Sequence, residues 1–101
     1  EAVASGVRAA MIASVGFGEA GEEGRARQEE LLTLARQHGL LVHGPNCMGI
    51  VSPANRHALY IGNIPSELPR GRIAAVCQSG SVAIGLMMTG RLGLSHLVSP
   101  P

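Results

Sequence analysis

The chain has 101 residues, with eight basic and seven acidic side chains and a formal net charge of +1. This length excludes two complete domains of ordinary size, which have about 100–150 residues each. The near-neutral charge and the presence of only two aromatic residues exclude the basic, base-stacking surface typical of nucleic-acid binding. No apolar run approaches the roughly 20 residues of a membrane span. We therefore expect a globular chain without nucleic-acid or membrane partners.

The two cysteines, Cys47 and Cys77, lie far apart in the sequence and have no pairing pattern around them. We interpret them as thiols of a protein in the reducing cytoplasm, with a single disulfide as the alternative. The two ends of the sequence interrupt elements, because residues 1–5 resemble the end of a helix closed by Gly6 and two prolines follow the last strand-like run. We expect the sequence to be an internal part of a longer chain.

The first part of the chain predicts a strand, a helix and a second strand. A short apolar run between glycines, Arg8–Val15, is typical of a buried strand. The glycine-rich segment Gly16–Gly21 predicts a flexible turn. Apolar residues at i, i+3 and i+4 then predict a helix from about Glu23 to His38, which Gly39 would end. Leu40–Val42 resumes as a strand, so we expect a parallel strand–helix–strand unit.

Residues 44–71 show no periodicity, and several prolines bar regular structure there. A structureless stretch of about 20 residues is unusual inside one compact domain. We therefore interpret this region as a passage between two domains, with Ile50, Val51 and Ala58–Ile61 packing along the way.

The last part of the chain repeats the order of the first. Ile73–Cys77 predicts a strand, Gln78–Ser81 a sharp turn and Val82–Arg91 a helix, and Leu94–Val98 predicts the next strand after Gly93. Both repeats indicate the α/β class with parallel sheets.

Ligands collect at the carboxyl ends of parallel strands, where three loops of this chain lie. The loop Ser79-Gly80-Ser81 offers two hydroxyls and consecutive backbone N–H groups without a bulky side chain. The helix behind it adds a partial positive charge, which predicts a phosphate or carboxylate site. The alternative is a plain serine N-cap with Gly80 allowing a tight turn. The other two loops are Ser14–Gly21, which lacks the third glycine of a dinucleotide motif, and Gly44–Gly49.

Other chemistries find less support in the sequence. Ser79 follows a predicted strand as a hydrolase nucleophile does, but Cys77 stands where that motif has glycine. No spacing among His43, Cys47, His57 and Cys77 matches a zinc ligand set, so we predict no metal site. Cys47 lies where a reacting group could pass, but no base is identifiable beside it.

Three stretches occur in a fixed order across nearly the whole chain: VGFGEAGEEG at 15–24, GPNCMGI at 44–50 and CQSGS at 77–81. Together they resemble the nucleoside-diphosphate-forming acyl-CoA synthetases. This family includes ADP-forming acetyl-CoA synthetase and the α subunit of succinyl-CoA synthetase. The GPNC motif with its following glycine is the most specific of the three.

The resemblance implies a division into domains and a set of site residues. Residues 1–52 would be the C-terminal part of a CoA-binding Rossmann-like domain, residues 53–71 an inter-domain linker, and residues 72–101 the N-terminal part of a flavodoxin-like domain of the succinyl-CoA-ligase type. The implied roles are CoA binding for Ala13, Ser14, Val15 and Gly16, proximity to the reacting thioester for Asn46 and Cys47, and phosphate binding for Ser79, Gly80 and Ser81.

The resemblance also implies an activity. An ADP-forming acid–CoA ligase interconverts acyl-CoA, ADP and phosphate with a carboxylic acid, CoA and ATP, through an acyl phosphate and a phosphohistidine. That histidine, and the parts that bind ATP or ADP with Mg²⁺, would lie outside this sequence, so we expect no activity from this stretch alone. Implied partners are a small carboxylic acid or acyl-CoA, and other domains or a β-type subunit in a cytoplasmic oligomer.

Two positions depart from the succinate enzymes. Ile84 stands where those enzymes have a substrate-contacting tyrosine, and Met48 replaces their proline. Both departures favour a monocarboxylic or aromatic acid over a dicarboxylate. Two alternatives to a ligase remain. One is the synthetase-like CoA-binding or regulatory region of a protein lysine acetyltransferase, and the other is a non-catalytic sensor module that binds CoA or a nucleotide.

Overall fold

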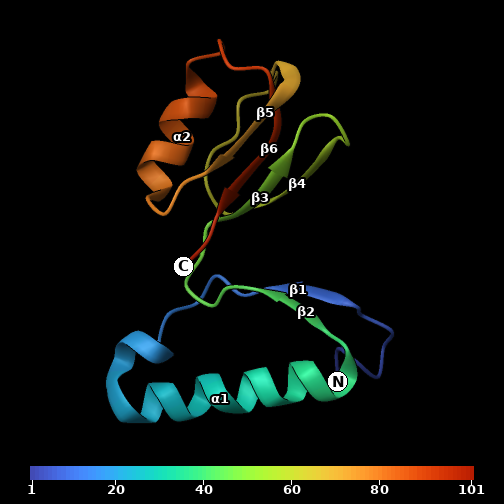
Figure 1. Cartoon of the computed structure of the whole chain (residues 1–101), viewed down its shortest axis with the longest axis vertical. Helices are drawn as coiled ribbons and strands as arrows, with labels where there is room; N and C mark the ends of the chain where they lie inside the picture. The colour runs from blue at the N-terminus through green and yellow to red at the C-terminus, as the bar shows by residue number, and fades with distance from the viewer. The chain divides into compact units, whose positions relative to one another are not determined.

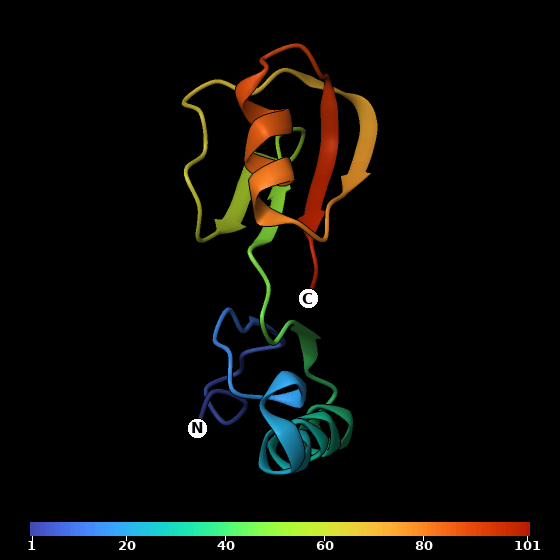
Figure 2. The same cartoon turned by 90° about the vertical axis from the view of Figure 1, so that its left-hand side faces the viewer.

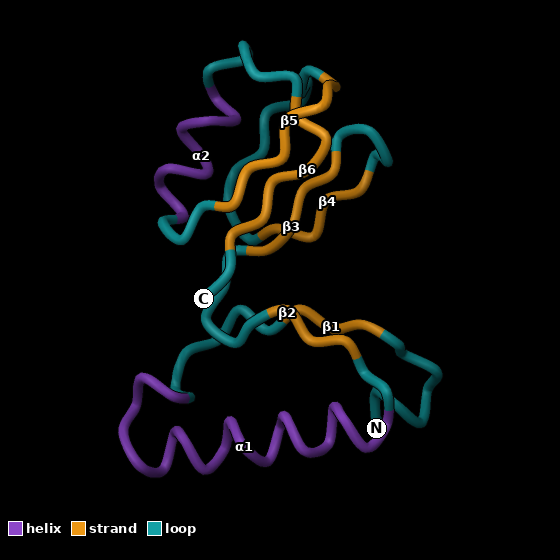
Figure 3. Tube along the Cα trace, viewed as in Figure 1, coloured by secondary structure: helices purple, strands orange, loops and turns teal.

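A computed structural model describes all 101 residues, which form two compact units, Glu1–Asn46 and Cys47–Pro101. The first unit contains β1 (Ala9–Met11), the short 3-10 helix η1 (Gly18–Ala20), α1 (Gly21–His38) and β2 (Leu41–His43) (Figure 1). The second contains β3 (Gly49–Ser52), β4 (His57–Tyr60), β5 (Arg70–Val76), α2 (Gly80–Met88) and β6 (Leu94–Ser99) (Figure 3).

The first unit is the predicted strand–helix–strand arrangement. β1 and β2 pair in parallel, with Ala10 opposite Val42, and α1 runs along one side of this pair (Figure 1). The helix ends at Gly39, whose φ of 63° is left-handed, a conformation that glycine adopts without a steric penalty. The predicted parallel unit is therefore confirmed.

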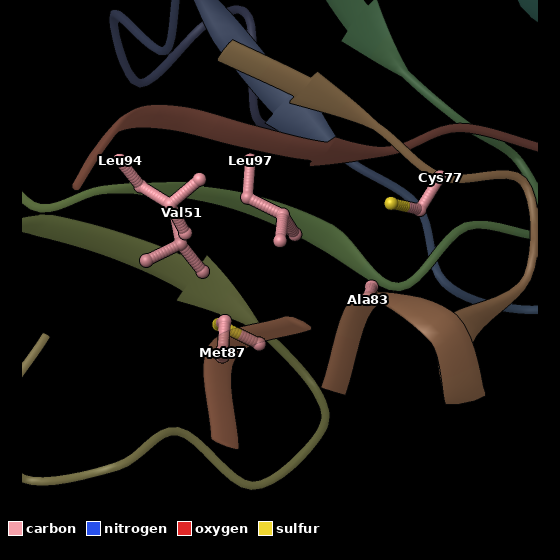
Figure 4. Packing of buried hydrophobic residues seen from close by; sticks show 6 residues of the cluster. All are labelled: Val51, Cys77, Ala83, Met87, Leu94 and Leu97. Carbon is pink, nitrogen blue, oxygen red and sulfur yellow. The ribbon is translucent and has the colours of Figure 1, made fainter. Parts of the chain in front are cut away.

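The second unit is a four-stranded mixed sheet in the order β4-β3-β6-β5. β5 and β6 are parallel, as predicted, whereas β3 is antiparallel to both of its neighbours. α2 covers one face of this sheet (Figure 2). A buried cluster between the helix and the sheet (Figure 4) consists of Val51, Cys77, Ala83, Met87, Leu94 and Leu97.

The predicted linker at 53–71 and the domain boundary after residue 52 are corrected by this sheet. Gly49 pairs with both Tyr60 and Ser99, so the chain enters the second unit at Cys47. β3 and β4 form a hairpin closed by a four-residue turn, in which the Arg56 N–H donates to the Pro53 carbonyl at 3.2 Å. β3 pairs with β6 and β4 pairs with β3, so this segment belongs to the sheet although neither strand has a long apolar pattern.

Two glycine backbones touch where β5 begins. The register of β5 against β6 shifts between Arg70 and Ile73, and the extra residues bring Gly71 onto Gly93. A Cβ on Gly71 would lie 2.5 Å from both the Cα and the carbonyl carbon of Gly93. Only glycine fits at position 71, because the neighbouring atoms belong to backbone and cannot rotate away.

Both cysteines are buried in the second unit, and neither forms a disulfide. The structure thus does not adopt the disulfide alternative, and Cys77 instead packs in the core cluster as a small apolar side chain. Neither helix combines the length and the apolar character needed to cross a membrane.

Candidate functional site

The turn between β5 and α2 presents backbone donors. Ser79 is the N-cap of α2, and its hydroxyl accepts from the Val82 N–H at 3.4 Å while its carbonyl accepts from the Ala83 N–H at 3.1 Å. The amides of Gly80 and Ser81 have no acceptor within the helix, because the first N–H groups of a helix never do. The N-cap interpretation of Ser79 is thus confirmed. The Ser79 cap leaves the N–H groups of Gly80 and Ser81 without an acceptor in the helix.

The surroundings of these two donors favour a negative charge. The first turn of α2 carries no acidic side chain, and Ser79 and Ser81 are both exposed. The helix dipole places a partial positive charge at this end of the nine-residue helix. The geometry is therefore suited to a phosphate or carboxylate group held by backbone N–H and serine hydroxyls.

Met48, which the sequence analysis did not assign to the site, packs directly beneath this turn. A Cβ on Gly80 would lie 2.8 Å from the Met48 Cγ and 3.2 Å from its Sδ. A Cβ on Gly62 would lie 3.1 Å from the Met48 Cε. Glycine at position 80 therefore leaves room for Met48, whose side chain packs against the first turn of α2.

The only tyrosine also lies in this packing. Its ring is 2.7 Å from the position of a Cβ on Gly62, and its hydroxyl is buried without a hydrogen-bond partner. Burial raises the pKa of the Tyr60 hydroxyl, and the electrostatic effect of Cys77 raises it further. Local pattern did not predict this placement, because Tyr60 is the last residue of β4, a strand that periodicity does not indicate.

The predicted CoA-lining stretch lies beside the start of the GPNC motif. The Asn46 N–H donates to the Ser14 carbonyl at 3.0 Å, and the Ile12 N–H donates to the His43 carbonyl at 2.9 Å. Asn46 has a left-handed φ of 56° and an exposed side chain. The structure thus brings Ala13–Gly16 and Asn46 together within the first unit.

Cys47 differs sharply from its neighbour Asn46. It belongs to the second unit, and only 4% of its surface is exposed. A thiol acts as a nucleophile only where solvent and substrate reach it. Of the predicted pair, Asn46 is exposed and Cys47 is buried, and the proximity of either residue to a reacting thioester stays a prediction.

The glycine-rich loop after Ser14 is capped by its own carboxylate. The Glu19 Oε1 accepts from the Gly16 N–H at 2.5 Å and from the Phe17 N–H at 3.3 Å. The Gln28 side-chain oxygen accepts from the Gly18 N–H at 3.0 Å. Glu19 and Gln28 therefore satisfy the backbone N–H groups of Gly16, Phe17 and Gly18 within the protein.

The first turns of α1 hold the loop from the other side. Arg27 donates to the Gly16 carbonyl at 3.3 Å and forms an ion pair with Glu23. A Cβ on Gly24 would collide with the Phe17 carbonyl. The loop is thus a fixed structure rather than the flexible turn that its glycines predicted.

The hydrogen bond from the Gly16 amide, with smaller contributions from the backbone amides of Glu19 and Phe17, lowers the pKa of Glu19 below its ordinary value. A lowered folded-state pKa contributes stability above the unfolded-state pKa, and this contribution is lost as the pH falls through the folded-state value. Glu19→Gln is therefore expected to lose part of the stability difference between pH values of about 6 and about 3. Thermal unfolding across this range measures the difference, with the exposed Glu30→Gln as the control. An unchanged pH dependence in Glu19→Gln would show that the carboxylate does not cap the loop.

The four residues considered for zinc are not gathered into a site. No three His, Cys, Asp or Glu side chains of the chain lie close enough together to hold a metal ion.

No family model matches the chain, but individual proteins do. It is 39% identical over 98 residues to the acetate–CoA ligase [ADP-forming] I subunit alpha of Pyrococcus furiosus, and 36% identical over 97 residues to the corresponding II subunit alpha. Each match covers 93% of this chain and 21% of the relative. The chain thus spans about a fifth of the length of the curated relatives it matches.

A solved structure agrees with these matches. The dinucleotide-forming acetyl-coenzyme A synthetase 1 of Candidatus Korarchaeum cryptofilum, solved in complex with phosphate and ADP, superposes with a TM-score of 0.79 at 31% identity. The match covers 98% of this chain and 21% of the solved chain. In sequence and in fold, the chain is a homologue of one segment of the ADP-forming acyl-CoA synthetase family.

Proposed function

We propose that this chain supplies the phosphate-binding turn and part of the CoA-binding surface of an ADP-forming acid–CoA ligase. The observation that carries the proposal is the start of α2, where the Gly80 and Ser81 amides have no acceptor within the helix and two exposed serine hydroxyls flank them. The homology to ligase segments supports the same assignment. Those relatives are named as ligases, so the acetyltransferase and sensor alternatives are not favoured.

The proposed role of the turn is electrostatic. A transferring phosphoryl group spreads negative charge over its oxygens, and donors already aimed at them stabilise that charge without rearranging. Ser79 holds the first turn in place, Met48 supports it from below, and the amides of Gly80 and Ser81 point their N–H groups out of the helix end. The phosphoryl carrier, proposed to be a phosphohistidine, and the Mg²⁺–nucleotide site would belong to other parts of the enzyme.

The proposed CoA surface is formed by Ala13–Gly16 and Asn46. Ser14 and Val15 are exposed, and 69% of the apolar Val15 surface is open. These residues offer a hydroxyl and an apolar side chain to an extended coenzyme whose thiol takes up or releases the acyl group. The Gly16 amide is occupied by Glu19, so Gly16 would contribute shape rather than a donor.

The same proposal assigns the wider context. The first unit would belong to a CoA-binding Rossmann-like domain and the second to a flavodoxin-like domain. The substrate would be a monocarboxylic or aromatic acid, in line with Ile84 and Met48. Other domains or a β-type subunit would complete a cytoplasmic, oligomeric enzyme.

Ser81→Ala in the intact protein tests the assignment of the turn. Loss of one neutral hydroxyl donor to the phosphoryl group should lower turnover about tenfold and leave the affinity for CoA unchanged. Turnover by coupled assay and CoA binding by calorimetry separate the two effects. The exposed Ser5→Ala is the matched control. A change confined to CoA affinity would place the turn at the coenzyme rather than at the phosphate.

A further inference from the structure

A pocket lies in the second unit at the end of the sheet opposite the phosphate turn, Ser79–Ser81. Its volume is about 500 Å³, within the size range of small-molecule sites. The sheet register places it, because Arg70 lies opposite Leu94 at the start of β6, whereas the phosphate turn follows Val76 opposite Val98. Its polar lining consists of Ser52, Arg56, His57, Ser66, Glu67 and Arg70.

The lining carries more positive than negative charge. Arg56 and Arg70 come from two separate segments, and Glu67 is the one acidic residue of the lining. Neither guanidinium takes part in an ion pair or a side-chain hydrogen bond. Two unpaired guanidinium groups at one pocket favour a ligand with a carboxylate or phosphate group, which a guanidinium recognises with paired N–H donors.

The backbone presents Arg56 to this pocket from a fixed turn. The φ of Arg56 is 54°, a left-handed conformation that favours glycine or asparagine over arginine. The turn is closed by the Arg56 N–H donating to the Pro53 carbonyl at 3.2 Å. The Ser52 hydroxyl accepts from Asn55 at 2.9 Å and donates to the Ser95 carbonyl at 3.0 Å. A charged side chain thus stands at a position that a glycine would occupy with less strain.

We propose that this pocket binds a small carboxylate with an apolar body. The carboxylate would be held by Arg56 and Arg70, and the apolar body would lie against Val51, Ile64 and Leu68, which line the same pocket. The site is distinct from the phosphate turn, none of whose residues lines it. The proposal therefore stands independently of the ligase assignment.

Fluorine NMR of 4-fluorobenzoate with the intact protein tests this site, with 4-fluorobenzylamine as a comparison probe and inorganic phosphate as a competitor. We expect saturable binding of the carboxylate, no binding of the amine, and only weak displacement of the carboxylate by phosphate, which has no apolar body. Arg56→Gly should weaken 4-fluorobenzoate binding about tenfold without lowering the unfolding temperature, because glycine suits the left-handed backbone. Arg70→Gln should weaken binding similarly. Arg72→Gln, on the same strand but not in the lining, is the matched control.

The variants distinguish this site from the phosphate turn. Ser81→Ala should leave 4-fluorobenzoate binding unchanged if the probe occupies this pocket. Binding that Ser81→Ala weakens and Arg56→Gly does not would overturn the proposal and place the probe at the phosphate turn. Displacement of 4-fluorobenzoate by an equal concentration of phosphate would overturn the apolar-body part, and no saturable binding of 4-fluorobenzoate would overturn the site altogether.

Discussion

Gly80→Val is expected to abolish phosphoenzyme formation in the intact protein, with a loss of at least about 100-fold. A side chain at position 80 meets the Met48 Cγ at 2.8 Å and its Sδ at 3.2 Å, and the two methyl groups of valine enlarge the overlap. The first turn of α2 must then shift, and the amides of Gly80 and Ser81 no longer point at the phosphoryl group. Labelling of the protein with radioactive phosphate measures the loss.

Two further variants test whether the overlap with Met48 causes this loss. Gly80→Ala should reduce phosphate labelling less than Gly80→Val does. Adding Met48→Ala to the Gly80→Val protein should restore part of the labelling, because the shorter side chain leaves room for the new Cβ. Circular dichroism of each variant checks that the second unit remains folded. Full labelling of a folded Gly80→Val protein would show that the turn does not hold the phosphoryl group.

Gly71→Val is expected to destabilise the second unit by about 3 kcal/mol, the upper range for overpacked sites. The new Cβ would lie 2.5 Å from two backbone atoms of Gly93, so no rotamer change relieves the overlap. Gly71 lies within the register shift between β5 and β6, so a displaced residue 71 would also disturb the pairing of these two strands. Denaturant unfolding followed by circular dichroism measures the change in the free energy of unfolding.

Gly85 provides the matched control within the same unit. It lies inside α2, is exposed, and has no atom within 4 Å of an added Cβ. Gly85→Ala should therefore stabilise the unit by about 0.5–1 kcal/mol through helix propensity. If Gly71→Val and Gly85→Ala changed the free energy of unfolding equally, the close approach of Gly71 and Gly93 would not contribute to the stability of the unit.

Local patterns predicted the elements that carry the candidate site. The apolar spacing and Gly39 predicted α1, and the apolar run before Gln78-Ser79-Gly80 predicted β5 followed by a helix start. These succeeded because periodicity, capping residues and turn chemistry act within a few residues. The boundaries differ by a few residues, since hydrogen bonds to neighbouring strands extend or shorten a strand.

The features that failed depend on distant contacts. β3 and β4 are short, and Pro53 lies in the turn between them. β3 is a strand because it pairs with β6, where Gly49 lies opposite Ser99, fifty positions away, and β4 is a strand because it pairs with β3. The packing of Met48 under Gly80 and the burial of Cys47 likewise arise only when the second unit folds. Glu19 had a readable local signal, an acidic residue three positions after Gly16, but the glycines around it indicated only a flexible turn.

The central claim is that the start of α2 holds a phosphate group with its backbone. The most direct measurement is a phosphate titration of the intact protein, selectively labelled with ¹⁵N-glycine and ¹⁵N-serine, followed through the amide resonances of Gly80 and Ser81. The account predicts saturable shifts at these two amides and none at Gly85, which lies within the same helix. Saturable phosphate binding elsewhere in the protein, with the Gly80 and Ser81 amides unmoved, would contradict it.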